Sequence, residues 1–167
     1  MAPRTRGRQQ TFSRDEFANL PTDVEIQALI ENDNPKALVL SADIIGKHLK
    51  NQNVKTSQLR KLFGMVRQIQ MNWSDIDSQK AYDSYRQAIL LKPKIGYQTQ
   101  RVWEKNRYQG QGMLILRDAV DAALDSIMNI DEEDEHKLQK RREYFYRLTD
   151  FLEAIVAYHK TYGGQES

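Results

Sequence analysis

Two groups of basic side chains have spacings that would place them along one face of a helix. Arg60 and Arg67 lie seven residues apart, and Gly64 stands between them, where a backbone or a phosphate can approach closely. The second group repeats at intervals of three, four and four residues: Lys94, Tyr97, Arg101 and Lys105. Such stripes suit a sugar-phosphate backbone, with a tyrosine ring that could stack or hydrogen-bond. Each stripe taken alone is also typical of a solvated helix face.

The distribution of charge along the chain favours a polyanionic partner. Residues 1–46 carry five basic and seven acidic side chains, residues 47–117 carry fourteen and four, and residues 118–167 carry six and twelve. The net charge of +2 therefore conceals a central block of +10, which contains both stripes, beside a block of −6. A block of this charge predicts a surface that faces nucleic acid, and the acidic block predicts one that faces water or a basic partner.

Residue types that serve catalysis lack the spacing that a site needs. His48, His136 and His159 have no partner at i+3 or i+4, so the sequence contains no helical zinc pair. Gly110 and Gly112 fit neither a P-loop nor a dinucleotide-binding motif, and we interpret them as a turn. Because the chain has no cysteine, thiolate chemistry and zinc ribbons are excluded as well.

Carboxylates also cluster, but in patterns with structural explanations. Asp118, Asp121 and Asp125 share one helix face, and we interpret them as a solvated face because no other oxygen ligands accompany them. The acidic run at residues 131–135 lies where a helix N-terminus favours negative charge. We therefore expect no enzyme, no metal site and no cofactor.

The elements that must position these residues are all helical. The apolar spacing predicts an all-α fold, a single compact bundle of five to seven helices at residues 20–164, after a flexible, disordered basic tail at residues 1–19. With 167 residues the chain suffices for one domain. No apolar run approaches the ~20 residues of a membrane helix, and no export signal is evident. The absence of cysteine fits a reducing compartment, so we expect a cytoplasmic protein without membrane contact.

Caps and apolar stripes predict where the helices lie. Thr22 with Glu25 predicts a short first helix, and Asn34 with Pro35 predicts a second one that continues to about Lys50. Ser57 is expected to cap the third, whose core face holds Leu59, Leu62, Phe63, Val66, Ile69 and Trp73.

The second half of the chain gives further helix predictions. A helix should open at Ser74 or Asp75 with Tyr82, Tyr85 and Ile89 facing inward. Pro93 predicts a kink or a new first turn before residues 95–105, and Gly110 and Gly112 should end that stretch. The last two predictions are a helix through Leu116, Val120, Leu124 and Ile127, and one of about thirty residues that Asp131 and Asp134 cap and Gly163 ends.

Three segments carry a resemblance to a known family. They read KTSQLRK at residues 55–61, KPKIGYQTQR at residues 92–101 and FLEAIVAYHKTYGG at residues 151–164. In order and spacing they resemble the small subunit of the type III-A CRISPR (Csm) effector complex, over roughly residues 54–164. The basic tail is not a feature expected of that family.

The resemblance implies a non-catalytic, all-helical RNA-binding subunit that serves antiviral defence inside a ribonucleoprotein complex. Its implied partners are the guide RNA, the target single-stranded RNA, the backbone subunit, the large polymerase-like subunit and sibling small subunits, with self-association. The resemblance implies that Lys55, Arg60, Lys61, Lys94 and Arg101 hold the target strand. Together with the residues of the two stripes and Lys92 of the second segment, the expected RNA-binding set is Lys55, Arg60, Lys61, Arg67, Lys92, Lys94, Tyr97, Arg101 and Lys105. Because pairing with a guide supplies sequence specificity, contacts to phosphates and sugars would suffice.

Two other functions fit the residues. A helix-turn-helix DNA-binding regulator would combine the helix ending near Lys50 with a recognition helix at residues 57–69. Apolar residues occupy most of that second helix, which leaves few side chains for base edges. A helical protein-protein adaptor would instead require the basic block to meet an acidic partner.

Overall fold

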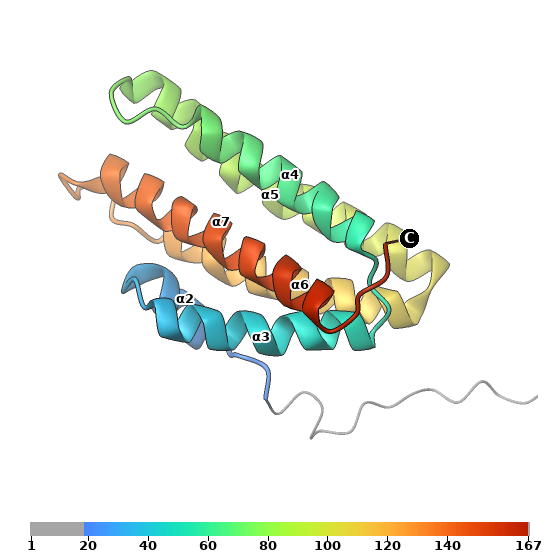
Figure 1. Cartoon of the computed structure of the whole chain (residues 1–167). Coiled ribbons are helices and arrows are strands. Elements are labelled where there is room, and N and C mark those ends of the chain that lie inside the picture. Colours follow the sequence, from blue (N-terminus) through green and yellow to red (C-terminus); the bar gives the residue numbers. More distant parts are fainter. Residues whose placement is uncertain (1–18, 167) are drawn as a thin grey trace, which may run out of the picture.

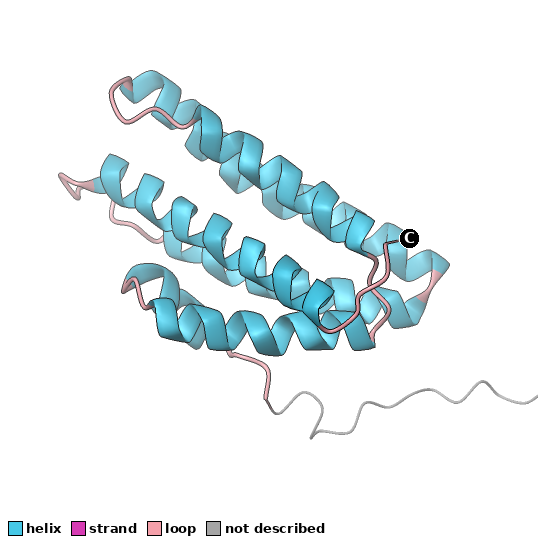
Figure 2. Cartoon of the chain, in the orientation of Figure 1, coloured by secondary structure: helices cyan, strands magenta, loops and turns pink. Residues whose placement is uncertain are grey.

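A computed structural model describes residues 19–166, and within this range the fold is a bundle of helices without strands (Figure 1, Figure 2). The six helices are α2 (Asp23–Glu31), α3 (Pro35–Asn51), α4 (Thr56–Asn72), α5 (Ser78–Lys105), α6 (Arg107–Met128) and α7 (Lys137–Thr161). The predicted all-α class and the predicted number of helices are confirmed. The predicted basic tail lies, except for Asn19, outside the described residues. No helix in the described range is long and apolar enough to cross a membrane.

The first two helices begin where their caps predict. The Thr22 hydroxyl oxygen accepts a hydrogen bond from the Glu25 backbone N–H at 3.2 Å. The Asn34 side-chain oxygen accepts one from the Ala37 N–H at 3.1 Å, and Pro35 occupies the first turn of α3. Each side chain satisfies one backbone donor that the helix itself leaves without a partner.

The start of α4 differs from the prediction, because distant backbone caps it instead of Ser57. The Thr56 N–H donates to the carbonyl of Gln165 at 2.8 Å, and the Ser57 N–H donates to the carbonyl of Glu166 at 3.2 Å. The Gln58 side chain accepts from the Lys55 N–H at 2.9 Å. We call residues 163–166 the C-terminal clasp; Figure 1 shows this segment reaching the start of α4.

Gly163 and Gly164 allow the clasp to turn back. Gly163 has a φ of 88°, a left-handed conformation that ends α7 as predicted and that glycine adopts without strain. Gly164 packs so closely against the His159 ring that no side chain fits there. The clasp therefore follows directly from the last turn of α7.

Helix α5 corrects two predictions about its own course. It begins at Ser78, because the Asp77 carboxylate accepts from the N–H groups of Gln79 and Lys80, whereas Ser74 caps only the preceding turn. Pro93 does not start a new helix, which was one of the two predicted alternatives; the other, a kink, stays a prediction. The neighbouring side chains Leu91 and Ile95 are fully buried, and their packing stabilises α5 as one helix across the proline.

The predicted turn at Gly110 and Gly112 is wrong, since both glycines lie inside α6. The chain turns at Asn106, whose side-chain oxygen accepts from the Gln109 N–H at 3.1 Å. A Cβ at position 110 would lie 2.6 Å from the Cα of Trp103, and one at position 112 would lie 2.5 Å from a Val54 methyl carbon. These positions require glycine because other segments pack tightly against α6.

The last helix, α7, is shorter than predicted. The Asp131 and Asp134 carboxylates accept from the N–H groups of Glu133 and His136, so they cap turns of the preceding loop and not α7 itself.

One residue predicted to face the core is exposed. Tyr82 faces solvent, because the small residues Ala81, Ser84 and Ala88 form the buried face of α5 in this part of the helix.

Helices α6 and α7 form the centre of the bundle. Each of them packs against α2, α3 and α5, and α7 also packs against α4. Figure 1 shows α4 and α5 side by side along one side of the bundle and α2 with α3 on the other. The paired helices α4 and α5 carry most of the basic residues predicted to bind RNA.

Candidate nucleic-acid interface

Helix α4 separates an apolar face from a basic one. Its buried face comprises Leu59, Leu62, Val66 and Ile69, as the apolar spacing predicts. Arg60, Lys61 and Arg67 are exposed, and the helix contains no acidic residue. No carboxylate of α4 itself can therefore neutralise this face.

Helix α5 presents the second predicted stripe to solvent. Lys94, Arg101 and Lys105 are exposed, and Tyr97 is 66% exposed. The Arg101 guanidinium carbon lies 5.8 Å from the centroid of the Tyr97 ring, within the range of a cation–π interaction. Because α5 continues through Pro93, Lys94 shares one rigid helix with Arg101 and Lys105.

The two helices and the start of α6 line an open pocket of about 220 Å³. We call it the basic pocket, and it is lined by Gln58, Lys61, Gln98, Arg101, Val102, Lys105, Gln109 and Met113. Three predicted residues, Lys61, Arg101 and Lys105, thus converge on one cavity from two helices. The lining contains three cations and no carboxylate, so it favours an anion such as a phosphate.

Two further predicted residues contact the C-terminal clasp instead of the pocket. The Lys55 ammonium donates to the Gln165 side-chain oxygen at 2.6 Å, and an Arg60 guanidinium nitrogen lies 3.1 Å from a Glu166 carboxylate oxygen. The other Glu166 oxygen accepts from Lys160 at 2.7 Å. The hydrogen bond from Lys160 and the charge of Arg60 lower the pKa of Glu166.

The remaining two predicted residues lie apart from the pocket. Arg67 donates to the Gln70 side chain at 2.8 Å on the same helix. Lys92 faces α6 and forms an ion pair with Asp125. The structure therefore divides the predicted set into residues of the basic pocket, residues near it on α5, and residues that have partners within the chain.

The sequence patterns did not identify the three glutamines of the basic pocket. Gln98 stands one helical turn before Arg101, a spacing that could have indicated it. Gln109 follows the turn at Asn106 and reaches the pocket because α6 folds back along α5. No local pattern signals that return.

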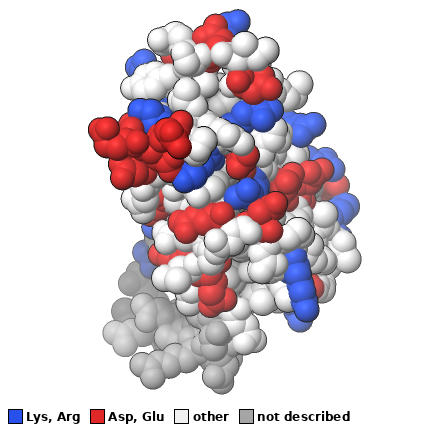
Figure 3. Space-filling view, turned by 90° about the vertical axis from the view of Figure 1, so that its left-hand side faces the viewer, with Lys and Arg blue, Asp and Glu red and all other residues white. Residues whose placement is uncertain are grey.

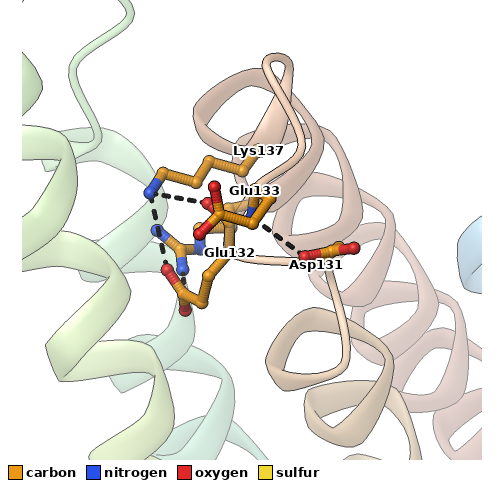
Figure 4. A network of polar contacts seen from close by, with 5 residues as sticks. Asp131, Glu132, Glu133 and Lys137 are labelled. Atoms are coloured by element: carbon orange, nitrogen blue, oxygen red, sulfur yellow. Dashed lines mark hydrogen bonds and ion pairs between the residues drawn. The ribbon is translucent and has the colours of Figure 1, made fainter.

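The acidic residues outside the pocket have structural roles. Figure 3 shows the end of the bundle that contains the connection from α6 to α7, where acidic side chains gather with basic ones between them. In the network of Figure 4, Glu132 accepts from Arg141 at 2.8 Å and lies 3.5 Å from the Lys137 ammonium. The described residues contain no group of three or more side chains that could hold a metal ion.

The interpretation of the three aspartates of α6 as a solvated face is partly wrong. Asp118 forms an ion pair with Arg117, and Asp125 forms one with Lys92. Asp121 is half-buried, and desolvation by burial raises the pKa of its carboxyl. The face turns partly toward α5, which packs against it.

The histidine at position 159 is structural. His159 is fully buried, and its Nε2 lies 2.6 Å from the Val54 carbonyl oxygen, which holds the loop between α3 and α4 against α7. His136 is exposed and lies 3.4 Å from the neighbouring Glu135 carboxylate.

The structure contradicts the helix-turn-helix alternative. The two helices of such a motif pack against each other, whereas α3 and α4, both described over their full length, do not. The proposed recognition helix instead buries Leu59, Leu62 and Val66 against the bundle.

Comparison with known proteins connects this geometry to one family. The family model described as Csm2 Type III-A matches residues 32–165, which include all six helices except α2. Neither the curated proteins nor the solved structures contain a match to the chain.

Proposed function

We propose that this chain, which belongs to the Csm2 Type III-A family and is therefore the small subunit of a type III-A CRISPR effector complex, holds RNA by its backbone at the basic pocket. Lys61, Arg101 and Lys105 would bind successive phosphates, and Lys94 and Tyr97 would extend the contact along α5. Pairing between guide and target supplies sequence specificity, so the subunit needs no contacts to base edges.

The convergence of three cations from two helices on a pocket without a carboxylate supports this proposal most directly. The end of the bundle in Figure 3 differs from this pocket, since acidic side chains lie among its basic ones. Family membership implies association with other Csm subunits and with the guide RNA. We propose that the target strand is the RNA that crosses the pocket.

Paired substitutions test the proposal. The variant Lys61→Ala/Arg101→Ala should weaken binding of single-stranded RNA about tenfold or more in a filter-binding assay at low salt, because two phosphate contacts are lost. The matched control Lys36→Ala/Arg86→Ala removes the same charges from exposed positions outside the pocket. Both variants should unfold at nearly the wild-type temperature, since exposed charges contribute within about ±0.5 kcal/mol. Equal losses in the two variants would show that RNA binds elsewhere.

We also propose that the chain performs no catalysis. Members of the family are generally non-catalytic structural subunits. A reconstituted complex that carries His48→Ala, His136→Ala and His159→Gln should still cut its target. Loss of cutting with normal composition and RNA binding would make this chain a catalytic subunit.

An exposed apolar end of the α4–α5 pair favours contact with another protein subunit. Ile76, in the connecting loop, is 93% exposed, and Met71, at the end of α4, is 73% exposed. Apolar side chains gathered at one exposed end are typical of protein interfaces. The variant Ile76→Asp should lower incorporation of the chain into a reconstituted complex. The control Val24→Asp changes another exposed apolar residue and should assemble normally; equal incorporation of the two variants would exclude this end as an interface.

A further inference from the structure

We propose that the basic pocket distinguishes RNA from DNA, through hydrogen bonds between ribose 2′-hydroxyls and the side-chain amides of Gln58, Gln98 and Gln109. The inference rests on the proposed function, because it concerns the same pocket, and it adds a specificity that charge alone does not supply.

The chemistry of the lining exceeds what phosphate binding requires. A phosphate oxygen only accepts hydrogen bonds, so lysine and arginine satisfy it fully. A carboxamide offers an acceptor as well as two donors. The 2′-hydroxyl of ribose is both donor and acceptor, and deoxyribose lacks it. Three carboxamides beside three cations therefore match a ribose next to its phosphates.

The amides are available to a ligand. Hydrogen bonds among the described residues engage neither the Gln98 nor the Gln109 side-chain amide. Gln58 uses its side-chain oxygen to accept from the Lys55 N–H at 2.9 Å, which leaves its amino group available. All three side chains are half-buried. Because these half-buried amides are open to water in the free chain, each hydrogen bond to a ligand replaces one to water and adds a modest net gain.

The surroundings of the amides also suit a sugar. Val102 and Met113 add apolar surface to the lining, against which the carbon atoms of a ribose can pack. The pocket, with a volume of about 220 Å³, has room for more than a single water molecule. Because the amides project from three helices and not from loops, the bundle holds their backbone positions in place.

The test compares nucleic acids that differ only at the 2′ position. Single-stranded RNA, DNA and 2′-O-methyl RNA of one sequence are titrated against the full chain at one ionic strength. The wild type should bind RNA about three- to tenfold more tightly than DNA, as expected for one or two neutral hydrogen bonds. It should bind 2′-O-methyl RNA about as weakly as DNA, because methylation removes the 2′ donor and adds bulk while the sugar remains RNA-like.

A substitution within the pocket assigns the effect to the amides. In Gln98→Met/Gln109→Met, each methionine keeps about the length and the helix propensity of glutamine but forms no comparable hydrogen bond. RNA affinity of this variant should fall toward that for DNA, since only Gln58 remains of the three amides, while DNA affinity and the salt dependence stay unchanged. Gln100→Met, on α5 but outside the pocket lining, should keep the wild-type ratio.

The outcomes separate this inference from the proposed function. Equal affinity of the wild type for RNA and DNA overturns the inference and leaves backbone binding intact. Equal loss of RNA and DNA binding in the methionine variant also overturns it, because the amides would then serve the phosphates. If neither nucleic acid binds, or if Lys61→Ala/Arg101→Ala binds as the wild type does, the proposed function itself fails.

Discussion

Glu166 places a carboxylate beside Arg60, a cation that the resemblance assigns to RNA. It lies within hydrogen-bond distance of Arg60 and Lys160, at 3.1 and 2.7 Å. Helix α4 has no acidic residue of its own, so this contact is formed by a distant part of the chain. A phosphate that approaches Arg60 must compete with the Glu166 carboxylate.

Removing that carboxylate should strengthen RNA binding. We expect Glu166→Gln to raise the affinity for single-stranded RNA about two- to threefold at low salt, because Arg60 and Lys160 lose their internal anion. Competitive filter binding measures the change. Glu153→Gln, an exposed change on α7, is the control and should have no effect. Unchanged affinity of Glu166→Gln would mean that Arg60 serves only the fold.

His159 should make the stability of the fold depend on pH. Burial lowers its pKa below the usual 6.5, and the charge of Lys160 acts in the same direction, whereas the hydrogen bond between Nε2 and the Val54 carbonyl opposes the shift. Between the lowered pKa and 6.5 the unfolded chain binds more protons than the folded one. The contribution of His159 to the free energy of unfolding should therefore be fully present above pH 6.5. It should be lost as the pH falls from 6.5 through the lowered pKa.

The substitution His159→Gln isolates this contribution. Glutamine retains a donor for the Val54 carbonyl but does not titrate. Thermal unfolding between pH 7.5 and 5.5 should show a steeper loss of melting temperature in the wild type than in the variant. The raised pKa values of Asp121 and Asp150 affect both proteins and cancel in the difference. Identical pH profiles would contradict a neutral, buried His159.

At the scale of the helices, two glycines predict opposite effects of one substitution. A Cβ at Gly64 would meet nothing within 4 Å, whereas one at Gly110 would lie 2.6 Å from the Cα of Trp103. We expect Gly64→Ala to stabilise the fold by about 1 kcal/mol, because alanine is the better helix former. Gly110→Ala should destabilise it by about 1–3 kcal/mol, because α5 and α6 must separate.

Chemical denaturation of both variants measures these effects. Two changes in the same direction would contradict the packing described for α5 and α6. Weaker RNA retention by the more stable Gly64→Ala variant would indicate that the RNA backbone approaches α4 at that turn.

The helices could be predicted where the signal is local, and predictions failed where it is not. The Thr22 and Asn34 caps and the apolar faces depend on residues within one helix, so periodicity was sufficient. Gly110 and Gly112 resemble a turn in sequence, and only the proximity of Trp103 and Val54 explains them. Pro93 likewise resembles a break, but the packing of Leu91 and Ile95 stabilises the helix through it.

The same distinction applies to the candidate site. The stripes on α4 and α5 could be predicted because each lies on one helix. The convergence of Lys61 with Arg101 and Lys105 depends on how the two helices pack. Pairing of Lys92 with Asp125 and of Arg60 with Glu166 joins residues far apart in sequence, so spacing alone could not identify it.

For the whole molecule, the segregation of charge predicts a moderate dependence of RNA binding on salt. If about three to five phosphates are neutralised, the logarithm of the association constant for RNA should fall with the logarithm of the salt concentration at a slope of roughly −2 to −3.5. The variant Lys61→Ala/Arg101→Ala should reduce the magnitude of that slope by about 1.4, which corresponds to two contacts. Titrations from about 50 to 200 mM salt measure both slopes.

The free chain should also show no preference among RNA sequences, since the proposed contacts of the pocket are to phosphates and sugars and not to base edges. A flat salt response, or tight binding of one sequence by the isolated chain, would contradict this account. Titration of several unrelated RNA sequences under the same conditions provides the comparison.

The C-terminal clasp also affects how the chain folds during its synthesis. The cap of α4 is formed by Gln165, 110 residues after Lys55. Ribosomes add about 5–20 residues per second, so roughly 5–20 seconds separate the synthesis of α4 from that of its cap. During this interval water must solvate the first N–H groups of α4, and Arg60 lacks its carboxylate partner. The nascent chain therefore exposes α4, a helix without acidic residues, and lacks the Glu166 counter-charge beside the RNA of the ribosome that makes it.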